Sequence, residues 1–460
     1  MDRMHRRLTL LVVFLTGMAV RPSPAADPPG KVTAAWDKVT RVSQTTPTLQ
    51  VVVNPPLRRG TAVHDNAFKA LRDLGADYVR YVPWLPYPKL GVAALEPPKD
   101  GKTSWDFSLI DPMTIDFLEA TKGHPVVLNF STIPAWLHKT DKPVAYPADP
   151  NEPTWKYTQR SEPRDPSFKE VADYYARLLA WYTQGGFTDE LGKRHESGHR
   201  YKVSHWEVLN EPDLEYPASP ETYTRLYDAV VEATRKVQPD IKFVGASLAF
   251  PRPNPEFLEY FLDKRNHKAG TPIDYISYHF YAVPDPDESA EVQEHTFFTQ
   301  AESFVNAARY IETMRKRLSP DTKTMVNEIG AISAEDLTQG EPGYVFKPIP
   351  NSYWNLASAS YAYLFGELSR IGIDVVGESQ LVGYPTQFPS VSMVDWADGK
   401  RRILLVNKRN RPFEVTIPGA SGGQLDRVDQ TTALQPPASS KLGSDTVALG
   451  GFAVAVVTLP

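Results

Sequence analysis

The sequence predicts an α/β protein, an eight-stranded (β/α)8 TIM barrel with a small C-terminal β-sandwich domain. From about residue 46, short apolar runs alternate with amphipathic stretches, the rhythm of strand-helix units around a parallel sheet. Eight such runs suit a barrel with loop insertions. After residue 400 the period of the apolar residues changes to two, which is typical of half-buried strands. We therefore expect the barrel over residues 46–400 and the β domain over residues 401–460.

The eight apolar runs are the expected barrel strands. Each is short and is bounded by turn signals or by the start of a helical pattern. They lie at residues 49–54, 78–82, 125–130, 203–209, 242–246, 275–280, 324–327 and 374–377.

Helices are expected between these strands, because apolar residues recur there at spacings of three and four. One begins after Asp165-Pro166 and another after Ser219-Pro220, each a capping residue followed by a first-turn proline. Others are expected near residues 68–74, 257–262, 304–318 and 354–368. Residues 379–402 are rich in Pro, Gly and Ser and lack helical periodicity, so we expect the eighth barrel helix to be missing.

The C-terminal domain is expected to contain strands at residues 403–407, 413–417, 425–428 and 447–459, the last broken at Gly450-Gly451. Four strands form a thin sandwich. The N-terminal segment, residues 27–45, is a candidate for one further strand of this domain, over residues 31–42.

The N-terminus resembles a secretory signal peptide over residues 1–26. A basic start precedes an apolar run, residues 8–20, and the small residues up to Ala26 suit a cleavage site. The run is shorter than the roughly 20 residues of a membrane-spanning helix. We expect an exported protein, periplasmic or extracellular, with no membrane span in its mature form.

Composition excludes several functions. The formal net charge of −5 becomes more negative once the arginine-rich signal peptide is removed, which makes nucleic acid an unfavourable partner. The chain has no cysteine, so disulfides, thiol catalysis and Cys-zinc sites are excluded.

Residues 195–199, His-Glu-Ser-Gly-His, fit the zinc-protease pattern, in which two histidines one helical turn apart bind a metal. That geometry needs a helix. The flanking residues are polar and the segment contains Gly198, without an apolar stripe. We expect an exposed loop here and no metal site.

Asn210-Glu211-Pro212 lies in a better setting, because it follows the buried fourth strand and reaches the C-terminal rim of the barrel, where barrel enzymes do chemistry. The seventh strand delivers Glu328 to the same rim. A glycosidase needs two such carboxyl groups, one to protonate the leaving oxygen and one to attack the anomeric carbon.

These motifs, with Ser277-Tyr278-His279-Phe280-Tyr281, resemble clan A of the glycoside hydrolases, and within it family 39, which holds β-xylosidases and α-L-iduronidases. The resemblance spans residues 50–380. It implies a retaining double displacement in which Glu211 is the general acid/base and Glu328 the nucleophile. It also implies that Asn210 donates a hydrogen bond to the sugar 2-hydroxyl.

Three more residues take roles from the resemblance. His279 and Tyr281 would face the cavity and help to keep Glu328 ionised, and Arg80 would hydrogen-bond it. A structural salt bridge in the barrel interior is the alternative for Arg80.

Several rim residues are candidates for binding sugar. Trp136 and Trp84 offer aromatic faces that suit pyranose rings, with core packing as the alternative for either. Asn129 is a candidate polar lining. Glu378 stands where many clan members have a tryptophan, and it would bind a hydroxyl or a cationic amino sugar, or neutralise Arg80.

The sequence therefore predicts a retaining glycoside hydrolase that acts on an oligosaccharide or polysaccharide and needs no metal or cofactor. The rival hypothesis is a secreted carbohydrate-binding barrel without turnover, since a fold alone does not establish activity.

Overall fold

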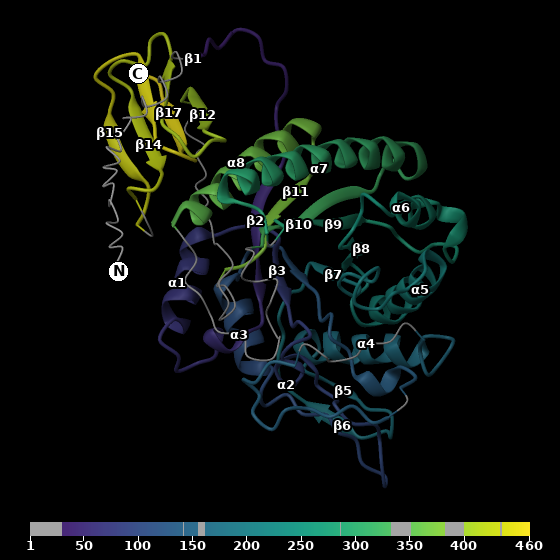
Figure 1. Ribbon diagram of the computed structural model, residues 1–460. Coiled ribbons are helices and arrows are strands. Elements are labelled where there is room, and N and C mark those ends of the chain that lie inside the picture. Colours follow the sequence, from purple (N-terminus) through teal and green to yellow (C-terminus); the bar gives the residue numbers. More distant parts are fainter. Residues whose placement is uncertain are drawn as a thin grey trace, which may run out of the picture.

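The computed structural model describes residues 30–140, 142–154, 162–285, 287–332, 351–381, 400–432 and 435–460 (Figure 1). The expected signal peptide and most of the segment expected to lack the eighth helix, residues 382–399, lie outside the described residues. Among the described helices, none combines the length and apolar character of a membrane span.

Eight parallel strands close into a barrel, which confirms the predicted fold class. All eight predicted runs overlap a barrel strand, and neighbouring strands pair in chain order, with the last strand closing onto the first. The strands are β2 (Thr46–Val52), β3 (Val79–Val82), β4 (Val126–Leu128), β7 (His205–Glu207), β8 (Lys242–Leu248), β9 (Tyr275–Ala282), β10 (Lys323–Ala331) and β11 (Val375–Glu378).

Helices surround the barrel (Figure 1). They are α1 (His64–Leu74), α3 (Asp111–Ala120), α4 (Lys169–Thr183), α5 (Pro220–Val237), α6 (Pro255–Leu262), α7 (Ala290–Leu318) and α8 (Asn351–Ile371), with the single turn α2 (Pro88–Gly91). The sequence analysis missed α3. Its residues Met113, Thr114, Phe117 and Leu118 are all buried, so no clear polar face marks the helical period.

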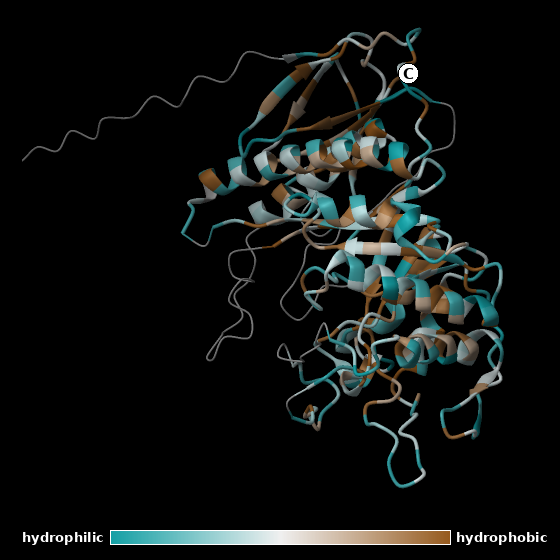
Figure 2. Cartoon of the chain, turned by 90° about the vertical axis from the view of Figure 1, so that its right-hand side faces the viewer, coloured by the Kyte–Doolittle hydropathy of each residue, from teal (hydrophilic) through white to brown (hydrophobic). Residues whose placement is uncertain are grey.

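The barrel interior changes character along the strands. At the N-terminal end, inward side chains such as Val127, Val244 and Met325 form an apolar layer. Toward the C-terminal rim the inward residues are polar, among them Gln50 and Arg80, although both are almost fully buried. In Figure 2 hydrophobic segments concentrate in the interior and hydrophilic ones on the outer helices and loops. The polar C-terminal end of the barrel is therefore where we expect the catalytic site.

The C-terminal strands form two sheets around a small apolar core of their own. One is antiparallel, with β12 (Arg402–Val406), β17 (Val454–Thr458), β14 (Gln424–Val428) and β15 (Ala438–Lys441) in that order; the other contains β1 (Gly30–Lys31), β13 (Phe413–Thr416) and β16 (Thr446–Leu449). Figure 1 shows this domain beside α7 and α8. Lys408 bonds Glu302 of α7 and lies over the ring of Tyr363 of α8.

Candidate active site

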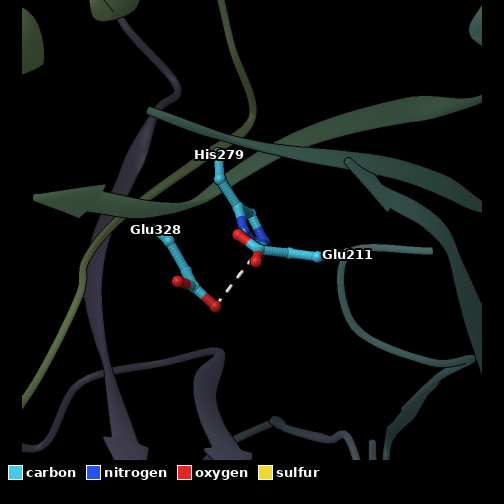
Figure 3. A group of neighbouring side chains, drawn as sticks. All are labelled: Glu211, His279 and Glu328. Atoms are coloured by element: carbon cyan, nitrogen blue, oxygen red, sulfur yellow. Dashed lines mark hydrogen bonds and ion pairs between the residues drawn. The ribbon is translucent and has the colours of Figure 1, made fainter. Parts of the chain in front are cut away.

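Glu211 and Glu328 lie at the C-terminal rim, Glu211 just after β7 and Glu328 within β10. Their carboxyl groups point toward one another, with the ring of His279 from β9 beside them (Figure 3). One carboxylate oxygen of each glutamate and one ring nitrogen of His279 all lie within 4.8 Å of one another. Such a short gap suits a nucleophile and an acid that serve the same anomeric carbon, as in retaining enzymes, where the carboxyl groups are about 5 to 5.5 Å apart.

The turn that carries Glu211 is strained. Leu209 and Glu211 adopt left-handed backbone conformations, with φ of 60° and 42°. Such conformations cost free energy for residues other than glycine and persist where the surroundings fix them. Here the Glu211 N–H donates to the Ser247 carbonyl at 2.9 Å, and the Leu214 N–H donates to the Glu211 carbonyl at 2.9 Å. The backbone therefore holds the Glu211 carboxyl in a defined place.

Glu328 accepts hydrogen bonds from two sides. Arg80 Nη1 donates to Oε1 at 2.5 Å, and the Tyr281 hydroxyl donates to Oε2 at 2.6 Å. His279 Nε2 lies 3.6 Å from Oε1. Burial alone would raise the pKa of Glu328, but the charges of His279 and Arg80, with the Tyr281 bond, lower it below its ordinary value. Glu328 is thus held in its ionised form.

Tyr281 reaches Glu328 because of a glycine on the neighbouring strand. Gly330 pairs with Tyr281, and a Cβ atom at position 330 would lie 2.1 Å from the Tyr281 ring. A larger residue would displace the ring. The sequence Glu328-Ile329-Gly330 therefore contains both the carboxylate and the space for its hydrogen-bond donor.

Glu211 has the opposite electrostatic setting. Its side chain is buried, and Oε1 lies 2.8 Å from His279 Nδ1. Burial raises the pKa of Glu211 above its ordinary value and outweighs the lowering effect of His279, while the charge of Glu328 adds to the rise. Two neighbouring carboxyl groups with pKa values displaced in opposite directions are suited to general acid and nucleophile.

The guanidinium of Arg80 also forms an ion pair with a second glutamate, Glu207, which the sequence analysis overlooked. Glu207 is fully buried and accepts from Arg80 Nε at 2.5 Å and from Asn129 Nδ2 at 2.5 Å through one oxygen. Its other oxygen accepts from Ser277 at 2.6 Å and from Asn327 at 2.7 Å. The structural salt bridge considered for Arg80 thus coexists with its bond to Glu328. A charged residue inside the predicted buried strand 203–209 was the signal for Glu207.

Two further hydrogen-bond partners of Arg80, Gln50 and Ser247, were not marked by any pattern in the sequence. Gln50 Oε1 accepts from Nη1 at 2.6 Å, and Ser247 Oγ accepts from Nη2 at 3.1 Å. Ser247 reaches this position through a bulge in β8, where its φ is 47°. A bulge re-aims a side chain without a characteristic sequence pattern, so Ser247 was not predictable from periodicity.

Asn210 lies between the two halves of the site. Its Oδ1 accepts from Arg80 Nη2 at 2.6 Å, and its Nδ2 donates to Glu215 Oε1 at 2.9 Å. The indole N–H of Trp84 donates to the same Glu215 oxygen at 2.6 Å. Glu215 was not among the predicted site residues.

A cavity of about 230 Å³ opens over these groups. Its lining combines the two glutamates with an apolar wall. The lining residues are Gln50, Val52, Val82, Trp84, Asn210, Glu211, Leu214, Ala249, Phe250, Tyr281, Glu328, Ile332 and Gln380. The cavity therefore contains both reactive carboxyl groups and an aromatic side chain, Trp84, of the kind that contacts sugar rings.

Trp136 and Asn129, which were predicted to bind sugar, do not line this cavity. The ring of Trp136 is covered by the guanidinium of Arg164 at 4.7 Å, and its N–H donates to the Ala94 carbonyl. Asn129 is fully buried beneath the site and bonds Glu207. It supports the site rather than contacting substrate.

The prediction for Glu378 is wrong for a geometric reason. Side chains alternate along a strand, and Glu378 pairs with Ile329 and Leu49, which pack in the main core. It therefore points away from the barrel interior and is not among the cavity-lining residues. It makes no bond to Arg80, and burial raises the pKa of Glu378 well above its ordinary value.

The zinc-protease pattern is excluded by its secondary structure. Residues of β6 (Arg194–Glu196) pair with β5 (Gly186–Thr188) in a hairpin, where a loop was expected. His195 bonds Asp189 at 2.8 Å, whereas His199 stacks on Tyr182 and lies 3.4 Å from Asp111. The two histidines thus have separate partners and do not converge on one metal.

Glu211, His279 and Glu328 are close enough to ligate a cation, but the positive charge at this site already comes from Arg80, 2.5 Å from Glu328. The donor set favours acid and base chemistry. A barrel whose rim presents two glutamates with oppositely displaced pKa values across one cavity has the site of the barrel hydrolases that use a carboxyl pair.

Two protein-family models match parts of the chain. The family model described as glycosyl hydrolases family 39 matches residues 193–328, which include both glutamates. The model of the D-apionate lactonase C-terminal immunoglobulin-like domain matches residues 391–457. No curated protein sequence matches the chain. The predicted resemblance to family 39 of clan A is confirmed, and with it the class of enzyme, a glycoside hydrolase.

Solved structures show the same fold. A family 39 β-xylosidase from Caulobacter crescentus is 16% identical, with a TM-score of 0.54 and coverage of 91% of this chain and 98% of that one. A family 51 α-L-arabinofuranosidase from Bifidobacterium longum is 13% identical, with a TM-score of 0.59 and coverage of 95% and 100%. A family 39 enzyme from Xanthomonas axonopodis pv. citri is 14% identical, with a TM-score of 0.52 and coverage of 92% and 99%.

Proposed function

We propose that this protein is a retaining glycoside hydrolase that cleaves an oligosaccharide or polysaccharide by double displacement. The observation that carries the proposal is the pair Glu211 and Glu328, whose carboxylate oxygens lie within 4.8 Å and whose pKa values are displaced in opposite directions. An inverting enzyme leaves room for a water molecule between its carboxyl groups and needs a separation of roughly 6.5 to 9.5 Å.

In the first step an oxygen of Glu328 attacks the anomeric carbon and forms an ester bond to it. The bond from that carbon to the leaving oxygen breaks, and Glu211 gives its proton to the leaving oxygen. In the second step the now ionised Glu211 takes a proton from water. The water oxygen attacks the anomeric carbon, and Glu328 leaves as a carboxylate.

The two glutamates are coupled in a way that supports both steps. While Glu328 is ionised, its charge raises the pKa of Glu211, which favours the acid form. Esterification of Glu328 removes that charge, so the pKa of Glu211 falls and the residue becomes the base that the second step needs. Arg80 and Tyr281 stabilise Glu328 each time it is released as an anion.

Export is part of the proposal and rests on the sequence of residues 1–26, whose basic start, apolar run and small-residue end suit a cleaved signal peptide. The rival hypothesis is a binding protein without turnover, which the fold alone does not exclude and to which the expected absence of the eighth barrel helix, in residues 379–402, lends weight. Most of that segment lies outside the described residues, whereas the displaced pKa values of the two glutamates favour an enzyme.

The test is a panel of aryl pyranosides and furanosides with the wild-type protein and Glu328→Gln. Furanosides belong in it because a family 51 arabinofuranosidase shares the fold. We expect release of the aryl group by the wild type only, and NMR of the first product should show the anomeric configuration of the substrate. A first product of inverted configuration would contradict the double displacement. Activity of Glu328→Gln equal to wild type would contradict the nucleophile.

A further inference from the structure

Glu215 is a third carboxyl group next to the catalytic pair, on a partly buried side chain. It lies four residues after Glu211 on the same turn. Its backbone N–H donates to the Glu211 carbonyl at 2.7 Å. Its Oε1 accepts two hydrogen bonds, from Asn210 Nδ2 at 2.9 Å and from the Trp84 indole at 2.6 Å. Its Oε2 is inaccessible to solvent and has no partner among the described residues. Burying a carboxyl group is costly, so its retention here needs an explanation.

The contacts of the Asn210 amide with Arg80 and Glu215 permit only one orientation. The guanidinium of Arg80 has donors and no acceptors, so the atom facing it must be the Asn210 carbonyl oxygen. The atom facing Glu215 Oε1 is then the amide nitrogen, which donates. Turning the amide over would set donor against donor at Arg80 and acceptor against acceptor at Glu215.

This orientation matters because Asn210 lines the cavity beside Glu211. One of its two amide N–H groups is bonded to Glu215, which leaves the other as a donor for a ligand. The sugar hydroxyl next to the anomeric carbon is the group whose hydrogen bonds strengthen in the transition state of glycoside hydrolysis. A freely turning amide would present its carbonyl oxygen as often as its N–H.

We propose that Glu215 is a positioning residue, which clamps Asn210 and Trp84 so that an amide N–H is presented to the 2-hydroxyl of the bound sugar. The inference rests on the proposed hydrolase function. It makes the enzyme selective for glycosides that carry a 2-hydroxyl group. Glu215 itself does not line the cavity and takes no part in proton transfer.

The experiment compares two dinitrophenyl glycosides of the best sugar in the panel, one with its 2-hydroxyl group and one 2-deoxy. We expect Glu215→Ala to lower kcat/KM on the first by about 10-fold or more, and by less than about 3-fold on the 2-deoxy substrate. Asn210→Ala should show the same selectivity. The double variant should be no worse than Asn210→Ala alone, because the two residues act as a unit.

Two further variants separate positioning from a general effect on folding. Glu215→Gln keeps an acceptor oxygen for Asn210 and Trp84, so its kcat/KM should stay within about 3-fold of wild type. Glu190→Ala is the matched control: Glu190 also accepts from a tryptophan, Trp105 at 3.0 Å, but at the β5–β6 hairpin and outside the cavity. It should leave both rates unchanged.

Equal losses on both substrates in Glu215→Ala would overturn the proposal and assign Glu215 a structural role. A loss in Glu215→Gln as large as in Glu215→Ala would also overturn it, because the acceptor would then not be what matters. Failure of the proposed function has a different signature, namely a folded wild-type protein that releases no aryl group from any glycoside of the panel.

Discussion

Glu207→Gln changes one atom of a fully buried side chain, and we expect it to destabilise the protein strongly. Each carboxylate oxygen of Glu207 accepts two hydrogen bonds. One oxygen accepts hydrogen bonds from Arg80 Nε and Asn129 Nδ2. The other accepts from Ser277 Oγ and Asn327 Nδ2. The NH2 group of glutamine only donates, so whichever way the amide turns, it meets two donors.

The expected loss in the free energy of unfolding follows from the number of hydrogen bonds lost. Two hydrogen bonds to a charged acceptor are lost, each worth about 1.5 to 3 kcal/mol. Removing one partner of a buried ion pair typically costs about 3 to 5 kcal/mol, since the other charge stays buried. We therefore expect the free energy of unfolding to fall by about 3 to 5 kcal/mol. Ser277 can rotate its hydroxyl proton, which favours the lower end of that range.

The assay is urea denaturation followed by circular dichroism, with Glu302→Gln on the outer face of α7 as the control. The control loses an exposed bond to Lys408 at 3.0 Å and should change the free energy of unfolding by less than about 1 kcal/mol. A Glu207→Gln protein that unfolds at the wild-type urea concentration would refute the reasoning. It would mean that the four hydrogen bonds to Glu207 contribute little to the free energy of unfolding.

The pH dependence of kcat/KM should be bell-shaped, because Glu328 must be ionised and Glu211 protonated. The lowered pKa of Glu328 puts the acid limb below the ordinary range of glutamate, and the raised pKa of Glu211 puts the alkaline limb above it; a profile that lacks either limb would contradict these two roles. Tyr281→Phe removes a hydrogen bond to ionised Glu328 and should move the acid limb to higher pH with little effect on the alkaline limb, as a pH–rate profile will show. His195→Ala lies at the β5–β6 hairpin and should leave activity unchanged, as should a chelator; loss of activity in either case would revive a metal mechanism.

Strand alternation explains which site residues the sequence could predict. Glu328 follows an apolar run, so its place at the rim was predictable from periodicity, whereas the place of Tyr281 was implied by the resemblance to family 39. Glu378 also ends an apolar run, yet it pairs with outward-facing residues and lies outside the cavity. A one-residue difference in register turns a side chain to the other face, and short runs such as 374–377 do not fix the register.

The remaining site residues depend on tertiary structure. Ser247 joins the site through a bulge, and Glu215 through a turn that brings it under Trp84, a residue more than a hundred positions earlier. The charge of Glu207 within a buried strand was visible in the sequence, but its four donors come from four different strands or strand ends. Such convergence is fixed by closure of the barrel rather than by any local pattern.

The pairing of Arg80 with two glutamates has a consequence for the covalent intermediate of the proposed double displacement. If Glu328 were the only counter-ion of Arg80, esterification would leave a guanidinium that is 1% exposed without a negative partner. A buried unpaired charge is strongly unfavourable, so the intermediate would be destabilised and the first step slowed. Glu207 bonds Arg80 through Nε, separately from the Nη1 bond to Glu328, and takes no part in either step. The network can therefore lose and regain the charge of Glu328 in each turnover while Arg80 remains paired, which separates the stability of the barrel from the chemistry at its rim.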